Sequence, residues 1–147
     1  MQLGVHSEIG KLRKVMVSRP SLAHERLTPA NCHDLLFDDV IWVQKARSDH
    51  ADFVLKMKDR GIEVYDIHDL LKEVFDASPE GRAFVLDRRV TDWTVGPALA
   101  RVLRPWLDEL DGHSLARHML GGIVRTDLPE DLVTPIMREA LSASELI

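Results

Sequence analysis

The segment "IEVYDI", residues 62–67, decides the fold class of this chain. Its side chains alternate along the backbone, which predicts a half-buried β-strand. The segment "LRKVMVS", residues 12–18, alternates in the same way and predicts another strand. Between them, residues 40–60 carry apolar side chains at steps of three and four, and Gly61 is placed to end a helix. Two strands joined by a helical crossover predict an α/β protein with parallel pairing.

From residue 68 onward the sequence pattern becomes helical. "HDLLKEVF" at residues 68–75 predicts one helix, and Ser78-Pro79 predicts the capped start of the next. Gly96-Pro97 opens a further helix, with Pro105 inside it and one apolar stripe formed by Leu99, Val102, Leu103, Trp106, Leu107 and Leu110. "HSLARHML" runs into the terminating pair Gly121-Gly122. Residues 130–142 predict a last helix.

The two patterns predict two parts of the chain. Residues 1–67 form the α/β part, and residues 68–147 form an α-helical domain. Parallel sheets are normally covered on both faces and contain four or more strands. Two strands do not make a core, so we expect the first part to belong to a larger sheet whose other strands lie beyond residue 147. The chain is then a fragment of a larger fold.

Composition narrows the class of protein. Apolar residues make up 45% of the chain and charged residues 29%, which is typical of a soluble globular protein. The formal net charge of −5 provides no basic field for nucleic acid, and no apolar run approaches the ~20 residues that span a membrane. A single cysteine and no apolar leader predict a cytoplasmic location. The seven histidines are scattered, so we expect no metal site.

The stretch "LTPANCHDLLFDDV", residues 27–40, holds the only cysteine. Thr28-Pro29 predicts a helix start, and about two turns of helix would follow, through Leu35 or Leu36. Cys32 and His33 are neighbours, and on a helix neighbouring side chains diverge by about 100°. A Cys-His pair that meets in space is therefore disfavoured. We interpret Cys32 as a buried packing residue, with nucleophilic catalysis as the alternative.

An Asp-Asp pair, Asp38 and Asp39, follows in the same stretch. Two carboxylates can act as an acid/base pair or hold a cation such as a guanidinium. Either residue also suits the N-cap of the helix that follows, where a side-chain oxygen accepts from free backbone N–H groups. We interpret the pair as a cap and a solvated carboxylate.

Residues 4–53 of this sequence resemble the amino-terminal segment of arginine deiminases. The resemblance is carried by Gly4-Val5-His6-Ser7-Glu8, by Leu12-Arg13-Lys14-Val15 and by the long run from Leu27 to Val43. Farther on, "LDRRVT" and "LGGIVRTDLP" resemble the helical insert of the same family.

This resemblance implies a hydrolase that converts L-arginine and water to L-citrulline and ammonium without a metal or organic cofactor. It implies a five-bladed α/β propeller, the pentein fold of guanidino-modifying enzymes, with an α-helical domain inserted. In the family a cysteine attacks the guanidinium carbon, a histidine serves as acid and base, and carboxylates clamp the guanidinium nitrogens. The family also commonly forms homo-oligomers.

The family's catalytic segments are absent from this sequence, namely Phe-x-Arg-Asp, Glu-Gly-Gly-Asp, His-x-Asp and the glycine- and histidine-rich stretch with the nucleophile. No catalytic residue is therefore expected within the chain, and Cys32 matches a family position other than the nucleophile. What does match is a loop near the active site. The resemblance implies that Leu36 contacts the substrate and that Phe37, Asp38 and Asp39 flank it.

Two functions are consistent with these observations. The first is the amino-terminal part of an arginine deiminase whose cysteine nucleophile lies outside this chain, so that the 147 residues alone are inactive. The alternative is a non-catalytic helical interaction or regulatory module derived from that enzyme, suggested by the helical pattern at residues 68–142. A change of substrate within the same superfamily is disfavoured by the resemblance to arginine deiminase in particular.

Overall fold

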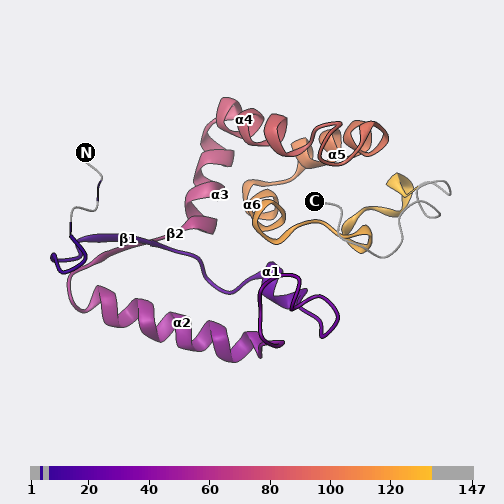
Figure 1. Ribbon diagram of the computed structural model, residues 1–147. Helices are drawn as coiled ribbons and strands as arrows, with labels where there is room; N and C mark the ends of the chain where they lie inside the picture. The colour runs from indigo at the N-terminus through magenta and orange to yellow at the C-terminus, as the bar shows by residue number, and fades with distance from the viewer. Residues whose placement is uncertain (1–3, 5–6, 134–147) are drawn as a thin grey trace.

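The computed structural model describes Gly4 and residues 7–133. Within that part the chain forms a mixed α/β structure that is mostly helical (Figure 1). In chain order the elements are β1 (Lys14–Val17), α1 (Leu22–Glu25), α2 (Val43–Lys58), β2 (Glu63–Asp66), α3 (Ile67–Ala77), α4 (Pro79–Arg89), α5 (Pro97–Glu109), α6 (Gly112–Gly121) and the 3-10 turns η1 (Arg125–Asp127) and η2 (Glu130–Leu132).

The strands β1 and β2 pair in parallel, as their sequences predict. The register places Val15 beside Val64, and these two side chains lie on the half-buried face of the sheet. Met16 and Tyr65 form the next pair and lie on the opposite, exposed face. The chain passes from β1 to β2 through α1 and α2, and α2 contacts β2 (Figure 1). The predicted helical crossover is therefore confirmed.

The buried core lies in the helical part of the chain. Helix α3 continues directly from β2 and packs most extensively against α6. Helices α4 and α5 lie on the side of the bundle away from the two strands (Figure 1). The core cluster consists of Phe75, Leu86, Val90, Leu103, Leu107, Leu115, Ala116, Ile123, Leu128 and Val133. All of these residues follow residue 67, so the two strands contribute none of the cluster. Two strands are too few to enclose a core, as the sequence predicts.

Most helix boundaries in this part agree with their sequence signals. The Ser78 side chain caps α4 by accepting from the Gly81 N–H at 3.0 Å, and Pro79 occupies the first turn. Gly96-Pro97 opens α5, in which Leu103 and Leu107 of the predicted stripe are fully buried. Gly122, with φ of 75°, ends α6.

One predicted helix differs from the structure, and a second lies largely outside the described residues. Pro29–Leu36 forms a series of turns instead of an α-helix, with Cys32 N–H bonded to Thr28 O at 3.0 Å. The turns close at Leu36, whose left-handed backbone cannot continue a right-handed helix. The predicted helix at residues 130–142 lies largely outside the described residues, and the described part of it is the 3-10 turn Glu130–Leu132.

Gly112, the first residue of α6, lies in close contact with α3. A methyl group at this position would come within 2.9 Å of the Lys72 carbonyl oxygen and 2.7 Å of Asp76 Cγ. The Asp76 carboxylate also accepts the Gly112 N–H at 3.1 Å, so this side chain is fixed at the crossing.

We expect Gly112→Ala to lower the free energy of unfolding by about 1–3 kcal/mol, because an added methyl must displace α3 backbone or break the Asp76 contact. Chemical denaturation followed by far-UV circular dichroism measures the change. Gly10→Ala is the matched control, since its methyl would meet the nearest atom at an ordinary 3.5 Å. Equal stabilities of the two variants would contradict close packing at Gly112.

Candidate functional site

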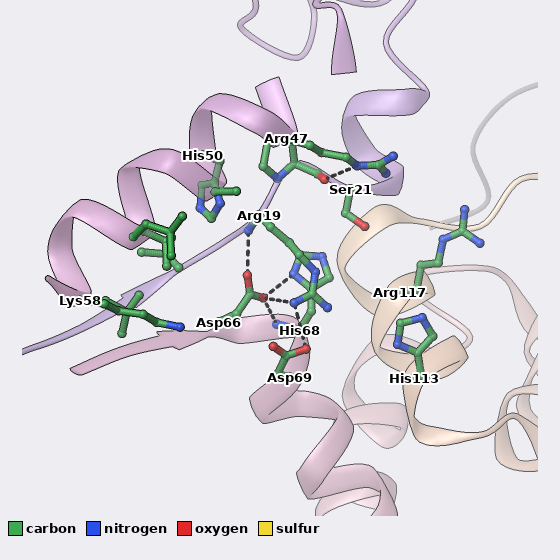
Figure 2. A pocket seen from close by; sticks show the side chains of 16 residues that line it. Arg19, Ser21, Arg47, His50, Lys58, Asp66, His68, Asp69, His113 and Arg117 are labelled. Carbon is green, nitrogen blue, oxygen red and sulfur yellow. Dashed lines mark hydrogen bonds and ion pairs between the residues drawn. The ribbon is translucent and has the colours of Figure 1, made fainter. Parts of the chain in front are cut away.

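A groove of about 760 Å³ opens at the carboxyl ends of the two strands. Its walls come from β1, α2, β2 and the start of α3 on one side and from α6 on the other (Figure 2). The strands and α2 contribute the apolar part of the lining, including Val17, Val54 and Val64. In open α/β sheets, ligands bind outside the carboxyl ends of the strands, so this groove has the position of a binding site.

Asp66 organises the polar end of the groove. Its side chain caps α3 by accepting the His68 N–H at 2.8 Å, and it also accepts the Arg19 N–H at 3.2 Å (Figure 2). The imidazole Nδ1 of the buried His68 lies 3.0 Å from the same carboxylate. The Arg19 guanidinium lies 3.3 Å from Asp66 and donates to Asp69 at 2.9 Å. One carboxylate at the end of β2 therefore fixes both a histidine and an arginine at the groove.

Cationic side chains from two other elements face this groove. Arg47 and Lys58 come from α2, and Arg117 comes from α6 (Figure 2). Arg47 donates Nε to the Pro20 carbonyl at 3.0 Å and also binds Glu25, whose other oxygen lies 3.4 Å from Arg117. The hydrogen bond from Arg47 holds the pKa of the Glu25 carboxyl below its usual range. Glu25 thus stays ionised and bridges α2 to α6.

The loop Leu36–Asp39 lies apart from the groove, since none of its four residues lines it. Asp38 and Asp39 are exposed, and Phe37 packs edge-on against the His24 ring with centroids 6.0 Å apart. Leu36 is 94% exposed. The structure therefore holds two separate candidate sites, the groove and this loop.

Leu36 has an unusual backbone conformation. Its φ is 62°, and no other residue except glycine has a positive φ among the described residues. The Phe37 N–H bonds to Cys32 O at 2.8 Å and the Leu36 N–H bonds to His33 O at 3.0 Å. These two bonds form a Schellman motif in which Leu36 occupies the position that glycine usually fills. A leucine in this region costs roughly 1–2 kcal/mol, and such strain is typical of functional sites.

The predicted capping role of Asp38 and Asp39 is wrong. Helix α2 begins after Trp42, and Trp42 makes no side-chain capping hydrogen bond. Asp39 instead accepts the N–H of its neighbour Val40 at 2.6 Å. The loop is three residues longer than the capping interpretation allows, so both carboxylates lie outside the first turn of α2.

Cys32 is a packing residue, as the sequence predicts. Its side chain is 2% exposed, and Sγ donates to the Pro29 carbonyl at 3.8 Å. His33 is exposed, so the two neighbouring side chains lie in different environments. A thiol that attacks a substrate must reach it, and the burial of Cys32 prevents this contact.

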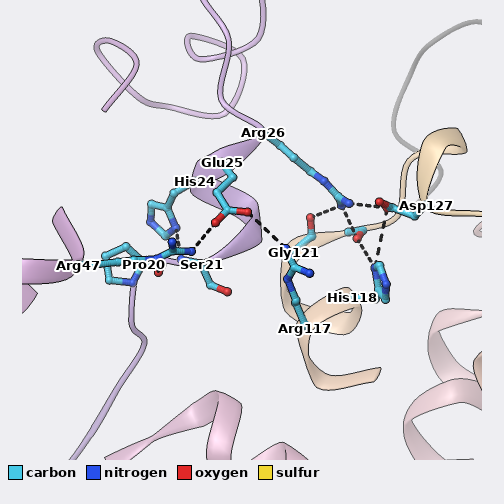
Figure 3. Close-up of polar contacts among 11 residues, drawn as sticks. Pro20, Ser21, His24, Glu25, Arg26, Arg47, Arg117, His118, Gly121 and Asp127 are labelled. Atoms are coloured by element: carbon cyan, nitrogen blue, oxygen red, sulfur yellow. Dashed lines mark hydrogen bonds and ion pairs between the residues drawn. The ribbon is translucent and has the colours of Figure 1, made fainter. Parts of the chain in front are cut away.

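Arg26 joins α1 to the end of α6 (Figure 3). Its Nη1 donates to the Gly121 carbonyl at 2.7 Å and to the Gly122 carbonyl, and its Nη2 binds Asp127. Asp127 in turn accepts the Val124 N–H at 2.8 Å. The Arg26 side chain is 13% exposed, and charge-assisted bonds of this kind are stronger than neutral ones.

His118 shares two acceptors with Arg26. Its Nδ1 lies 3.4 Å from the Gly122 carbonyl and 3.9 Å from Asp127 (Figure 3). The ring also packs against Trp106, with centroids 5.5 Å apart. Burial lowers the pKa of His118 below its usual value, because the charged imidazolium loses hydration there, and the attraction of Asp127 opposes this shift only in part.

The sequence alone predicted neither the groove nor the contacts of Arg26 with the end of α6. Arg19 and Asp66 are 47 residues apart, and Arg26 and Asp127 are 101 apart, so no spacing rule connects them. One available signal was the position of Asp66, a carboxylate placed directly between a strand and a helix and therefore suited to an N-cap.

Two classes of feature are absent from the described part of the chain. Among Gly4 and residues 7–133, no group of three or more His, Cys, Asp or Glu side chains is placed to hold a metal ion. Within the same residues, every helix is too short or too polar to cross a membrane.

By its fold the chain is a mixed α/β protein in which a small parallel sheet leads into a helical bundle. A family model described as arginine deiminase matches residues 33–145, which is more than half of the chain. The chain therefore belongs to the arginine deiminase family. The match covers the loop at residues 36–39, α2, β2 and the helical bundle, and it begins after β1 and α1.

The strain at Leu36 predicts a gain in stability on substitution. We expect Leu36→Gly to raise the free energy of unfolding by about 1 kcal/mol, because glycine adopts the positive φ without a Cβ penalty and the exposed leucine side chain loses little packing. Thermal and urea denaturation measure the effect. Leu35→Gly, at a neighbouring position with negative φ, should not stabilise the chain. A destabilised Leu36→Gly variant would contradict the strain.

His118 predicts a pH-dependent stability. Its pKa is lower in the folded protein than in the unfolded one, so its neutral form favours folding above pH ~6.5, and this contribution is lost as the pH falls toward the folded-state pKa. We expect His118→Asn to flatten the decline in stability between pH 7 and pH 5, measured by urea denaturation. His113→Asn, at an exposed position of the same helix, should keep the wild-type slope. Parallel slopes for wild type and His118→Asn would rule this out.

Proposed function

We propose that this chain is the amino-terminal part of an arginine deiminase, which hydrolyses L-arginine to L-citrulline and ammonium. The observation that carries the proposal is the family match over residues 33–145. In the reaction a cysteine thiolate attacks the guanidinium carbon and ammonia departs. Water then displaces the thiolate, which leaves the ureido group of citrulline and regenerates the thiol. L-Arginine is thus the partner of the complete enzyme.

The nucleophile of this reaction lies outside the chain. Cys32 is the only cysteine in the sequence, and its side chain is enclosed. Among the described residues its hydrogen-bond partner is a backbone carbonyl, that of Pro29, and a buried thiol paired in this way has no access to substrate. The histidine and the carboxylates that complete the site are supplied by the same additional polypeptide. The 147 residues alone are therefore inactive.

The loop Leu36–Asp39 contributes the substrate contacts of this part. Leu36 projects from a strained turn and is almost fully exposed, so its side chain is available to a ligand that approaches from outside. Phe37 is held against His24, which limits the movement of the turn. Asp38 and Asp39 make no cap, and their exposed carboxylates flank Leu36 with charge that a guanidinium attracts.

The two parts of the chain serve different purposes in this proposal. Residues 1–67 belong to the catalytic five-bladed propeller, and residues 68–147 form the inserted helical domain. Support comes from the two-stranded sheet, whose exposed side includes Met16 and Tyr65 and which adds nothing to the core cluster. Such a sheet is typical of one piece of a larger one. The single, buried cysteine supports a cytoplasmic location.

A helical interaction module is the alternative function. The observation that favours it is the core cluster, which lies entirely between Phe75 and Val133 and makes the bundle self-contained. A module of this kind would bind a partner without any requirement for arginine chemistry.

Citrulline formation distinguishes the two functions. We expect the chain alone to form no citrulline from L-arginine, and citrulline to appear when the polypeptide that carries the nucleophile is supplied. Colorimetric detection of citrulline, with ammonium measured in parallel, follows the reaction. Turnover by the chain alone would contradict an external nucleophile, and no turnover in the reconstituted protein would favour the interaction module.

Cys32→Ala is the matched control in the active preparation. Because Cys32 packs in the interior, its loss should lower stability by about 1 kcal/mol and leave the turnover number of the preparation unchanged. Loss of all citrulline formation in a folded Cys32→Ala protein would assign the chemistry to this residue.

A further inference from the structure

We infer that Arg26 is a positioning residue: its clamp on the end of α6 sets the place of the loop Leu36–Asp39. This inference rests on the proposed function of the loop and adds the element that controls it. Residues 33–40 are all exposed, and the contact of this loop with another element is the edge-on packing of Phe37 against His24 of α1. Its location therefore depends on α1 and on the turns that precede the loop, both of which adjoin Arg26.

The first step is the clamp itself. A single guanidinium binds two consecutive carbonyls, those of Gly121 and Gly122, and the carboxylate of Asp127 (Figure 3). The planar fork of arginine suits several acceptors in fixed directions, which a lysine ammonium cannot reproduce. Gly121 allows the approach, because a methyl group there would come within 2.5 Å of Leu22 Cβ in α1. The segment at residues 22–26 is thus seated directly on α6.

The second step connects the clamp to the turns. The backbone carbonyl of Arg26 accepts from Asn31 Nδ2 at 3.0 Å, and Asn31 Oδ1 accepts the Thr28 N–H at 2.7 Å. The Thr28 carbonyl then accepts the Cys32 N–H at 3.0 Å. The buried side chains of Leu27 and Cys32 pack beneath this hydrogen-bonded segment. Residues 26–32 therefore move as one piece with the Arg26 backbone.

The third step reaches the loop. The Cys32 carbonyl accepts the Phe37 N–H at 2.8 Å, which closes the strained turn at Leu36. From the guanidinium of Arg26 to the backbone of Leu36, every link is a hydrogen bond or a short stretch of chain. When the hydrogen bonds of the Arg26 guanidinium are lost, residues 26–32 are no longer held against α6. The exposed loop then moves with these residues.

Arg82 provides a control, because its loss should lower the stability of the bundle without moving the loop. It also donates from one guanidinium nitrogen to two helix carbonyls, those of Leu107 at 2.7 Å and of Leu110. Both acceptors lie at the end of α5, within the bundle and outside the groove and the loop. Removal of either arginine breaks bonds from one guanidinium nitrogen to two backbone carbonyls. Removal of Arg26 also breaks its ion pair with Asp127, and only Arg26 is connected to the turns.

The first experiment compares Arg26→Gln with Arg82→Gln by amide hydrogen exchange on the 147-residue chain. We expect Arg26→Gln to speed exchange at the Cys32, Leu36 and Phe37 amides by about tenfold or more relative to the bundle amides, since hydrogen bonds to charged groups contribute on that order. Arg82→Gln should leave that ratio at the wild-type value. Asp127→Asn provides a second route to the same release and should resemble a weaker Arg26→Gln.

The second experiment uses the citrulline-forming protein. We expect Arg26→Gln to raise the KM for L-arginine about tenfold and to change kcat by less than about twofold, because a misplaced loop weakens substrate binding without touching the reacting atoms. Arg82→Gln should leave both constants unchanged, and Arg26→Lys should fall between Arg26→Gln and wild type.

The outcomes separate the inference from the proposed function. Equal exchange patterns in Arg26→Gln and Arg82→Gln, or faster exchange without a change in KM, would overturn the positioning role and leave arginine hydrolysis intact. Absence of citrulline from the wild-type preparation would refute the proposed function, and the exchange comparison would still decide whether Arg26 controls the loop. If Arg26→Gln does not fold, Arg26→Lys and Asp127→Asn carry the same comparison.

Discussion

The ion pair between Arg26 and Asp127 is the constraint on which the arrangement of this chain depends. It links α1, which follows the first strand, to the turn that follows α6, so that two segments 101 residues apart become neighbours. Glu25 adds a parallel link between α2 and α6 through Arg47 and Arg117. These links add to the packing of Leu22 on α6 and to the direct continuation of β2 into α3, while the core cluster itself follows residue 67.

The groove and the loop are two separate candidate sites that differ in their position in the fold. The groove lies where parallel strands end, and its polar end is organised by Asp66, whose cap on α3 also orients Arg19 and His68. The loop lies outside the groove and carries its strain at Leu36. The chain belongs to the arginine deiminase family, and in the function proposed for it the loop supplies substrate contacts. The ionic links of Arg26 and Glu25 hold α1, which contacts the loop through His24 and Phe37, against α6.

Local signals in the sequence predicted most of the secondary structure. The two alternating segments became the parallel pair, Ser78-Pro79 became the start of α4, and the apolar stripe with Leu103 and Leu107 entered the core. The capping of α2 and the helix after Thr28 were predicted wrongly. In both cases the failure lies in residues 28–42, where an irregular, strained turn overrides local helix signals. The contact between Arg26 and Asp127 could not be predicted, because the spacing of residues in a sequence carries no information about contacts between segments a hundred residues apart.

The cross-strand pair of Lys14 and Glu63 has a consequence for handling this protein. Their charges lie 2.6 Å apart on the exposed face of the sheet, beside Met16 and Tyr65. Unpaired strand edges act as templates for other chains, and charged side chains, lysine above all, are the usual protection against such templating. These two residues are therefore gatekeepers against fibril-like stacking, and replacing both by apolar side chains would favour aggregation of concentrated stocks.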